Sequence, residues 1–463
     1  MPDAAISSVT DTVLDELRAI FGERLNTSQA VRDQHGHDES FHETAPPDAV
    51  VFAESTEEVQ RAVQVCAKHK VPVIPFGTGT SLEGHVCALY GGISIDVTGM
   101  NKILAVNAED LDCRIQPGVR RKQLNEHLRD TGLFFPIDPG ADASLGGMAA
   151  TRASGTNAVR FGTMMDNVRG LEVVLADGRV IRTGSRAKKS AAGYDLTRLF
   201  VGSEGTLGII TEITLKLHGI PERISAATCV FPDLESAVNT VILTIQAGIP
   251  VARMELLDTL QIEACNKYSK LDLKEAPTLF FEFHGTDVGV DDQIASLRTI
   301  AGEFGGADFA WADKLEDRNR LWQARHDAYY AGLALRPGCK GFSTDVCVPI
   351  SKLAECILET QADVAESNIV APLVGHVGDG NFHLVVVIDP DDKDEMSRAM
   401  ALNSRLVERA ISMGGTCTGE HGVGYGKIDH LEKEHGEAIS VMRDLKRTFD
   451  PDNIMNPGKI IRM

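Results

Sequence analysis

The sequence predicts an α+β fold in two domains, followed by a shorter C-terminal segment. At 463 residues the chain is too long for one ordinary hydrophobic core, so several domains are expected. Residues 1–220 alternate short strands and helices that are joined by glycine-rich loops. Residues 221–413 alternate strands with long helices, which is typical of an α+β domain on a mostly antiparallel sheet. Residues 414–463 return to glycine-rich loops and end in DPDNIMNPGKI.

Local signals in the first region predict a helix and a hairpin. Ser55 and Glu58 have the spacing of a capping box, which opens a helix. One apolar face then recurs at helical spacing, through Val59, Ala62, Val63, Cys66 and Ala67. Further along, Asp177-Gly178 lies between two strand-like runs and predicts a tight β-hairpin.

The second region is expected to contain five long helices between strands. Strand-like runs are LFFEFHGT, FSTDVCVPI and HLVVVIDP. The helical segments are 233–248, 287–304, 315–335, 351–367 and 391–413.

Composition excludes several classes of protein. The net charge of −20 repels phosphate backbones, and aromatic residues make up only 5%, so nucleic acid is not expected as a partner. Nine cysteines without a C-x-x-C pair indicate a reducing compartment. No secretory signal and no apolar run of about 18 residues is visible, so no transmembrane segment is predicted. We therefore expect a cytoplasmic protein, with peripheral docking on a membrane left open.

Two glycine-rich loops could hold a nucleotide. PFGTGTSLEGH (75–85) follows a strand, but it is neither the Rossmann G-x-G-x-x-G nor a P-loop. Its glycines and hydroxyls would still expose several backbone N–H groups, which suits a diphosphate. A plain tight turn is an equal alternative for this loop alone. Residues 136–163 lack helical or strand periodicity, and a loop of that length is more often functional than idle.

The two loops and GSEGTLGIIT together resemble the PCMH-type FAD-binding domain of the vanillyl-alcohol-oxidase-type flavoproteins. With LWQARHDAYYA, GFSTDVCVPI, GHVGDGNFH, CTGEHGVGYGK and MNPGK, the chain resembles the D-lactate dehydrogenase branch of the D-2-hydroxyacid dehydrogenases. The resemblance covers nearly the whole chain. It implies an FAD-binding domain at 1–220, a substrate or cap domain at 221–413, and a segment at 414–463 that returns to the flavin site.

The resemblance also implies which residues bind FAD. Amides of Gly77–Ser81 would bind the pyrophosphate, and Asn456 would lie near the isoalloxazine. Thr80 stands where relatives with covalent flavin often carry a histidine, so noncovalent FAD is expected. His85 comes too late in the loop for that linkage and is interpreted as structural. The full set is Pro75, Gly77, Thr78, Gly79, Thr80, Ser81, Pro139, Gly140, Ala141, Ser144, Leu145, Gly146, Gly147, Thr151, Gly155, Glu204, Gly208, Ile210 and Asn456.

A pair of histidines predicts a metal site. VAPLVGH and HLVVVI are strand-like and joined by a short glycine-rich turn, so a hairpin would bring His376 and His383 together. Glu420 in TGEHG could supply the third ligand, and two histidines with a carboxylate suit Zn²⁺, Mn²⁺ or Fe²⁺. The alternative from spacing alone is that both histidines cap backbone groups. The resemblance implies a divalent metal at these three positions.

The implied chemistry is the oxidation of a 2-hydroxyacid. A divalent cation would stabilise the alkoxide, and a neutral histidine would take the hydroxyl proton. His421 is the candidate base, and the flavin N5 would accept the hydride. Arg325 is the candidate for binding the substrate carboxylate, because a guanidinium offers two parallel donors. A helix-surface arginine is the alternative reading of Arg325.

The substrate and the electron acceptor are less defined. Ser343 and Thr344 stand where relatives acting on dicarboxylic acids offer a basic group, which favours D-lactate, oxidised to pyruvate. D-2-hydroxyglutarate or glycolate is the alternative substrate. We expect an electron acceptor other than NAD: a cytochrome, a quinone, an electron-transfer flavoprotein or oxygen. Glu255 and His284 could face the site, but core packing is the expectation for both.

Two other classes of protein compete with this interpretation. A flavin-free metallohydrolase could use the same two histidines and glutamate, but it would leave the glycine loops unexplained. A binding scaffold without activity would have no need for the complete set of polar residues, which is Arg325, His376, His383, Glu420 and His421.

Overall fold

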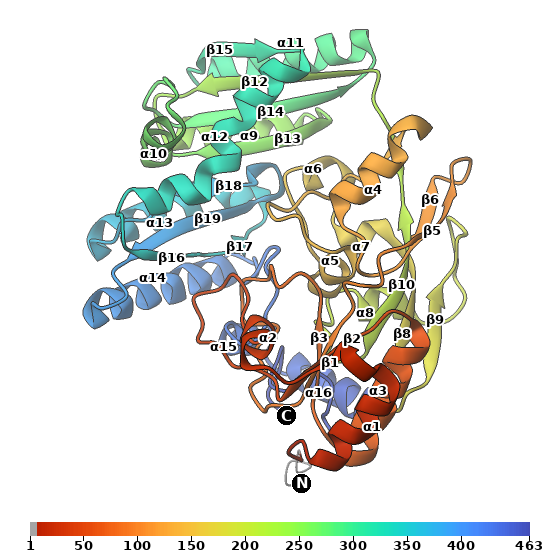
Figure 1. Cartoon of the computed structure of the whole chain (residues 1–463). Coiled ribbons are helices and arrows are strands. Elements are labelled where there is room, and N and C mark those ends of the chain that lie inside the picture. Colours follow the sequence, from red (N-terminus) through yellow and green to blue (C-terminus); the bar gives the residue numbers. More distant parts are fainter. Residues whose placement is uncertain (1–6) are drawn as a thin grey trace. The chain divides into compact units, whose positions relative to one another are not determined.

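The computed structural model describes residues 7–463, and these residues form two compact units (Figure 1). Unit 1 comprises the described residues up to Ser154 together with Gly162–Ile220 and Glu420–Met463. Unit 2 comprises Gly155–Phe161 and Pro221–Gly419. The second unit is therefore inserted into the first along the chain. Among the described residues, no helix combines the length and the apolar character that a membrane span requires.

The first sheet of unit 1 is short and mostly parallel. Its strands run in the order β1 (Leu25–Asn26), β2 (Ala49–Phe52), β4 (Ile93–Asp96) and β3 (Val73–Phe76), and β4 pairs in parallel with both β2 and β3. Helices α1 (Asp11–Phe21) and α3 (Thr56–His69) bury their apolar faces in the core of this sheet.

Helix α3 begins as predicted, but only half of the capping box forms. Ser55 Oγ accepts from the backbone N–H of Glu58 at 3.3 Å. The Glu58 carboxylate accepts from the backbone N–H of Glu54 instead of Ser55, and it also binds Arg24. The ion pair with Arg24 draws the glutamate away from the reciprocal cap.

The second sheet of unit 1 is antiparallel and has its own core. Its strands run in the order β5 (Ile103–Asn107), β6 (Asp112–Ile115), β10 (Ile209–Lys216), β8 (Val168–Val174) and β9 (Val180–Gly184). The predicted hairpin is confirmed, because β8 and β9 pair antiparallel around Asp177-Gly178, with Gly178 at φ +80°. A separate two-stranded ladder joins β7 (Leu133–Phe134) to β11 (His218–Gly219).

Two stretches expected to be loops contain helices. Within or just after residues 136–163 lie α5 (Leu145–Thr151), α6 (Ala158–Phe161) and α7 (Met164–Asn167). The C-terminal segment contains α15 (Ile428–His435) and α16 (Ala438–Phe449). The first three helices are too short to show a period in the sequence, and glycine-rich flanks hid the other two. Three further short helices belong to unit 1: α2 (Gln29–Gln34), α4 (Arg121–Leu128) and α8 (Leu196–Phe200).

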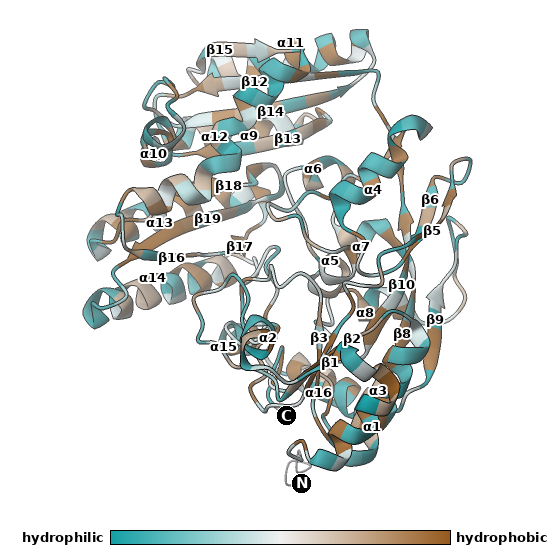
Figure 2. Cartoon of the chain, in the orientation of Figure 1, coloured by the Kyte–Doolittle hydropathy of each residue, from teal (hydrophilic) through white to brown (hydrophobic). Residues whose placement is uncertain are grey.

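Unit 2 is built on one antiparallel sheet, as predicted. Its path is β15 (Ala307–Ala312), β12 (Arg223–Val230), β14 (Thr278–Gly285), β13 (Val251–Leu257), β18 (Leu373–Gly375), β19 (Asn381–Ile388) and β16 (Lys340–Ser343), and β17 (Val346–Cys347) also pairs with β19. Strand β19 is buried along its whole length, and Figure 2 shows it as a hydrophobic strand. A continuous apolar run is expected for a strand that is covered on both faces.

The five predicted helices of unit 2 are confirmed within a few residues. They are α9 (Leu234–Gln246), α11 (Asp287–Glu303), α12 (Leu315–Ala334), α13 (Leu353–Ser367) and α14 (Lys393–Ser412). A sixth, α10 (Thr259–Ser269), was not predicted; Asp258 caps its N-terminus by accepting from the backbone N–H of Gln261. Helices α10 and α12 pack in one core against the sheet face that carries Leu257, Phe280 and Val385.

A buried lysine ties the C-terminal segment into unit 1. Lys446 on α16 donates through Nζ to the backbone oxygens of Thr206 and Met455 at 2.8 and 2.7 Å, and to the carboxylate of Asp450 at 2.5 Å. Asp450 in turn accepts from the backbone N–H groups of Ile454 and Met455. This cluster fixes the chain just before Asn456.

Replacing this lysine should destabilise unit 1 strongly. We expect Lys446→Met to lower the free energy of unfolding by about 3 kcal/mol or more, because it leaves a buried carboxylate without its cation. Urea denaturation measures the change. Lys352→Met is the control, since Lys352 makes an exposed pair with Glu355 on the surface and its loss should matter little. Equal effects of the two substitutions would contradict the anchoring role.

Candidate functional site

The first glycine loop presents its backbone amides. Residues 77–81 are all half-buried. Within the described part of the chain, none of their five backbone N–H groups donates a hydrogen bond to another protein group. Thr78 Oγ1 and Thr80 Oγ1 lie 3.2 Å apart beside them. Unpaired amides in a glycine turn form a concavity that favours an anion such as a diphosphate.

The second glycine loop packs closely on the first. Ser144, the N-cap of α5, donates its backbone N–H to Thr78 Oγ1 at 3.3 Å. A Cβ added to Gly77 would lie 2.5 Å from Ser144 Oγ, so a larger residue there would force Ser144 to move. Gly79 has φ +67°, a backbone conformation that residues other than glycine rarely adopt. The requirement for glycine at 77 and 79 thus has a local physical reason.

Glu204 binds a neighbouring loop and a histidine. Its buried carboxylate accepts from the backbone N–H groups of Val423 and Gly424 at 2.7 and 2.8 Å. His85 Nε2 lies 3.2 Å from the same carboxylate. Burial alone would lower the pKa of His85, but Glu204 and Asp38 raise it overall. Burial would raise the pKa of Glu204, but His85 and the two amides lower it overall. The pair is therefore a buried ion pair, which agrees with a structural role for His85.

Asn456 has one acceptor left over. Its Nδ2 donates to the backbone oxygens of His85 and Glu204 at 3.1 and 2.8 Å, and its backbone N–H donates to Val73. Its Oδ1 is buried and has no hydrogen-bond partner among the described residues. A buried acceptor without a donor costs free energy, so a ligand that donates there would be stabilised.

The other predicted FAD residues are distributed over several elements. All of them belong to unit 1 except Gly155, which lies in unit 2 at φ +148°. Pro75 lies on β3, Leu145, Gly146, Gly147 and Thr151 on α5, Gly208 immediately before β10, and Ile210 on β10. Pro139, Gly140 and Ala141 lie in the loop before α5.

The histidine hairpin of unit 2 is confirmed. Strands β18 and β19 pair antiparallel, with Val374 opposite His383. His376 and His383 are both buried, and their ring centroids lie 5.5 Å apart at an interplanar angle of 85°. Each ring offers a nitrogen, and these two nitrogens lie within 4.8 Å of each other. This separation allows both to bind one cation.

Each of these histidines uses Nδ1 for a bond inside unit 2. His376 Nδ1 lies 2.8 Å from Glu255 Oε1, and His383 Nδ1 lies 2.7 Å from the backbone oxygen of Thr344. Carboxylates and carbonyls only accept, so Nδ1 is the protonated nitrogen in each ring. In the neutral form of each ring the lone pair is therefore on Nε2, as metal-binding histidines require.

Arg325 and His376 share one buried carboxylate. Arg325 Nε on α12 donates to Glu255 Oε2 at 2.6 Å, while His376 holds the other oxygen of Glu255. Arg325 Nη2 lies 3.5 Å from both ring nitrogens of His376, so it lies over the face of the ring. Burial would raise the pKa of Glu255, but His376 and Arg325 lower it overall. Arg325 is thus not a helix-surface arginine.

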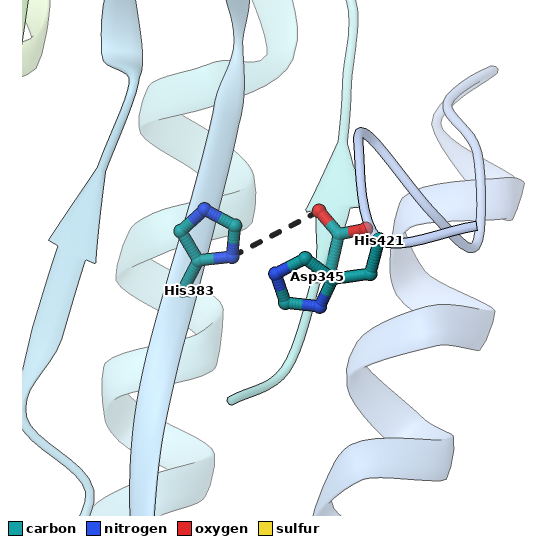
Figure 3. A group of neighbouring side chains, drawn as sticks. All are labelled: Asp345, His383 and His421. Carbon is teal, nitrogen blue, oxygen red and sulfur yellow. Dashed lines mark ion pairs between the residues drawn. The ribbon is translucent and has the colours of Figure 1, made fainter. Parts of the chain in front are cut away.

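Asp345 holds the end of unit 2. Its carboxylate accepts from Asn381 Nδ2 at 2.8 Å and from Thr418 Oγ1 at 2.7 Å. It also lies 3.8 Å from His383 Nδ1, the pair marked in Figure 3. Thr416 pairs through its backbone with Cys347. Residues 416–418 are therefore fixed to Asp345 and to β17, which pairs with the strand of His383, and they end two residues before Glu420.

Glu420 and His421 begin the last segment of unit 1. Both are half-buried. His421 Nδ1 lies 3.9 Å from Glu83 Oε1, and Glu83 also pairs with Lys427 at 3.0 Å. The loop that follows His421 is held by Glu204 through Val423 and Gly424. The proposed base therefore sits on a loop that a buried carboxylate orders.

Two residues of these clusters were missed in the sequence. Core packing was expected for Glu255, whereas its carboxylate binds Arg325 and His376. Asp345 was not considered. Glu255 did carry a signal: a glutamate inside the apolar strand VARMELL must find a cation if it is buried. Asp345 gave a weaker signal, because it follows the polar residues Ser343 and Thr344 instead of lying inside a continuous apolar run.

Two family descriptions match most of the chain. Residues 47–184 match the FAD binding domain, and residues 220–460 match the C-terminal domain of FAD linked oxidases.

Curated relatives match along nearly the full chain. A probable mitochondrial D-lactate dehydrogenase of Danio rerio is 53% identical over 99% of this chain and 94% of its own length. A mitochondrial D-lactate dehydrogenase [cytochrome] of Arabidopsis thaliana is 47% identical over 98% of this chain and 80% of its own. The glycolate oxidase subunit GlcD of Bacillus subtilis is 36% identical over 98% of this chain and 97% of its own.

Solved structures share the fold. p-Cresol methylhydroxylase superposes with a TM-score of 0.81 at 20% identity and covers 97% of this chain and 96% of that one. An alkyldihydroxyacetonephosphate synthase superposes with a TM-score of 0.78 at 22% identity, over 98% of this chain and 86% of that one. The predicted α+β fold of the PCMH type is thereby confirmed.

The buried pair of His85 and Glu204 makes stability depend on pH. The raised pKa of His85 adds stability that is fully present below 6.5 and is lost as the pH rises through the folded-state pKa. The lowered pKa of Glu204 adds stability that is present above 4.5 and is lost at lower pH. Stabilisation by the pair is therefore largest between pH 4.5 and 6.5.

We expect His85→Gln to destabilise the protein by about 3 kcal/mol in that window, since it leaves the buried Glu204 uncompensated. The difference from the wild type should shrink as the pH rises through the raised pKa of His85, above which that side chain is neutral as well. Denaturation curves at a series of pH values measure this. His69→Gln removes a half-buried pair with Glu16 near the surface and is the control. A pH-independent loss would contradict the ion pair.

Proposed function

Because the chain belongs to the FAD-linked oxidases, in the group of the D-lactate dehydrogenases, we propose that it oxidises D-lactate to pyruvate with FAD and a divalent metal. The enzyme class and the flavin follow from the family. The metal, the residue roles and the acceptor are our proposals. The observation that carries the substrate is the 53% identity, along nearly the full length, to a probable D-lactate dehydrogenase.

The residues of unit 1 fit FAD. The five backbone amides of residues 77–81 suit a pyrophosphate. Gly77 packs closely on Ser144 and carries no side chain that could cover these amides. The buried Oδ1 of Asn456 is an acceptor for a ring N–H of an isoalloxazine. Thr80 supplies no histidine for a covalent bond, so we propose noncovalent FAD. When bound, FAD supplies the acceptor for the hydride.

The donor set fits a divalent metal. His376 and His383 would bind through Nε2, since both Nδ1 atoms are engaged. Thr418 donates a hydrogen bond to Asp345, and Glu420 lies two residues further along the chain. We propose Glu420 as the third ligand. Two imidazoles and a carboxylate suit Zn²⁺ or Mn²⁺, and Fe²⁺ as well. When bound, such a cation would lower the free energy of the substrate alkoxide.

Arg325 and His421 would act on the substrate directly. With Nε on Glu255, the terminal nitrogens of Arg325 remain as donors for the carboxylate of lactate. His421 would take the proton of the C2 hydroxyl as that hydroxyl becomes the carbonyl. The C2–H bond breaks with its electron pair, so lactate loses two electrons and two protons in all and becomes pyruvate.

Substrate size is set by residues near the carboxylate. Ser343 and Thr344 offer no cation, and Thr344 uses its hydroxyl and its carbonyl for Leu384 and His383. This supports a monocarboxylate such as D-lactate over D-2-hydroxyglutarate. Glycolate is the second candidate, because a glycolate oxidase subunit is among the relatives.

We propose a cytochrome as the electron acceptor, because several relatives carry that word in their names. A quinone or an electron-transfer flavoprotein is the alternative. The relatives from Danio rerio and Arabidopsis thaliana are named mitochondrial, so the cytoplasmic location expected from composition remains a prediction. The match to an FAD binding domain argues against the flavin-free metallohydrolase.

An anaerobic spectrum tests the proposed function. We expect D-lactate, but not L-lactate, to bleach the flavin band near about 450 nm of metal-loaded protein. Chelation of the metal should slow the bleaching, and Zn²⁺ or Mn²⁺ should restore it. Unchanged bleaching after complete metal removal would refute the metal requirement. Bleaching by glycolate alone would transfer the assignment to the second candidate.

Replacing Arg325 by lysine should weaken the reaction while preserving the charge. We expect Arg325→Lys to lower kcat/KM for D-lactate about 10- to 100-fold, because a charged hydrogen bond contributes about 1.5–3 kcal/mol. Steady-state kinetics measure it. Arg320→Lys, on an exposed turn of the same helix, is the matched control. An unchanged kcat/KM in Arg325→Lys would remove this residue from the site.

A further inference from the structure

We infer that Glu255 is a positioning residue that orients the proposed metal ligand His376 and the carboxylate-binding Arg325 at the same time. The inference rests on the proposed function and adds a residue to it. Glu255 lies on β13, in the middle of the sheet of unit 2, and is fully buried. It is a ligand of nothing in that proposal, so its burial needs another reason.

The geometry gives each carboxylate oxygen one task. Oε1 lies 2.8 Å from His376 Nδ1, and Oε2 lies 2.6 Å from Arg325 Nε. Both distances are those of charge-assisted hydrogen bonds. The carboxylate of Glu255 therefore sets the positions of two side chains from different elements. His376 lies in the turn after β18, and Arg325 lies on α12.

For His376 the consequence is a fixed tautomer. Nδ1–H donates to Glu255, so in the neutral ring Nε2 carries the lone pair, and the ring cannot rotate without losing the bond. Outer carboxylates of this kind orient metal-binding histidines, and their loss typically costs about 10- to 100-fold in metal affinity. His383 has the same arrangement with a neutral carbonyl, Thr344, in place of the carboxylate.

For Arg325 the consequence is a fixed direction. The bond from Nε anchors the inner edge of the guanidinium, and Nη2 lies over the ring of His376. With Nε fixed in this way, the plane of the guanidinium is fixed, and so are the directions of the N–H groups on its two terminal nitrogens. Glu255 also compensates the charge of Arg325 in the interior, where an unpaired guanidinium would be costly.

Unit 2 contains a matched control. Glu282 on β14 is also buried, pairs with His284 Nε2 at 2.7 Å and lies 3.4 Å from Arg253 Nη1. It thus shares the chemistry of Glu255, but its partners are neither metal ligand nor substrate-binding residues in our proposal. A general loss of packing would affect both glutamates alike.

The test measures metal affinity without turnover. Purified FAD-bound protein would be stripped of metal and titrated with Zn²⁺ against a fluorescent chelator. We expect Glu255→Gln to weaken Zn²⁺ binding about 10- to 100-fold, because the amide cannot accept from both donors. Glu282→Gln should stay close to wild type. Glu255→Asp keeps the charge and should recover part of the affinity, and it also serves if Glu255→Gln does not fold. Flavin content and melting temperature report on the fold.

The outcomes separate the two proposals. If wild-type protein binds no Zn²⁺ and no Mn²⁺, the metal proposal fails, and the role of Glu255 towards it fails as a consequence. If wild type binds and Glu255→Gln binds equally well, the positioning role alone is overturned. Equal losses in Glu255→Gln and Glu282→Gln would assign the effect to packing and overturn it too.

Discussion

A carboxylate buried away from water needs hydrogen-bond donors around it. In each unit one such carboxylate fixes the position of residues of the candidate site. In unit 1 Glu204 collects two amides and His85, and thereby orders the loop that follows His421. In unit 2 Glu255 collects Arg325 and His376. Since the free energy of leaving such a group unpaired is several kcal/mol, each carboxylate selects one arrangement of its neighbours. The polar groups around each carboxylate thus keep one orientation, because any other orientation would leave the buried charge unpaired.

The two units leave different kinds of polar group available to a ligand. Unit 1 leaves backbone donors unpaired in a loop where Gly77 and Gly79 keep side chains away. Unit 2 occupies one nitrogen of each histidine so that the other carries the lone pair. A diphosphate is recognised by many weak donors, whereas a cation needs few acceptors of known direction. The contrast agrees with the proposed binding of the FAD diphosphate by the loop of unit 1 and with the proposed role of the two histidines of unit 2 as metal ligands.

Sequence reasoning predicted the regular parts of this protein and missed the contacts between distant segments. The long helices of unit 2, the hairpin at Asp177-Gly178 and the pairing of β18 with β19 follow from periodicity and turn chemistry, which are local. The short helices after residue 136 have too few residues to show a period. The role of Glu255 depends on α12 and on the turn after β18, about 70 and 121 residues away. No local pattern encodes such a partner.

The insertion of unit 2 within unit 1 has a consequence for synthesis on the ribosome. The chain is made from its N-terminus, so the sheet of unit 2 emerges complete before residues 420–463 are available. Those residues include Lys446 and Asn456, which close unit 1 against Thr206 and Val73. The early part of unit 1 must therefore wait with an exposed edge while a later domain folds. A chaperone that shields nascent apolar strands would have its longest task at this stage.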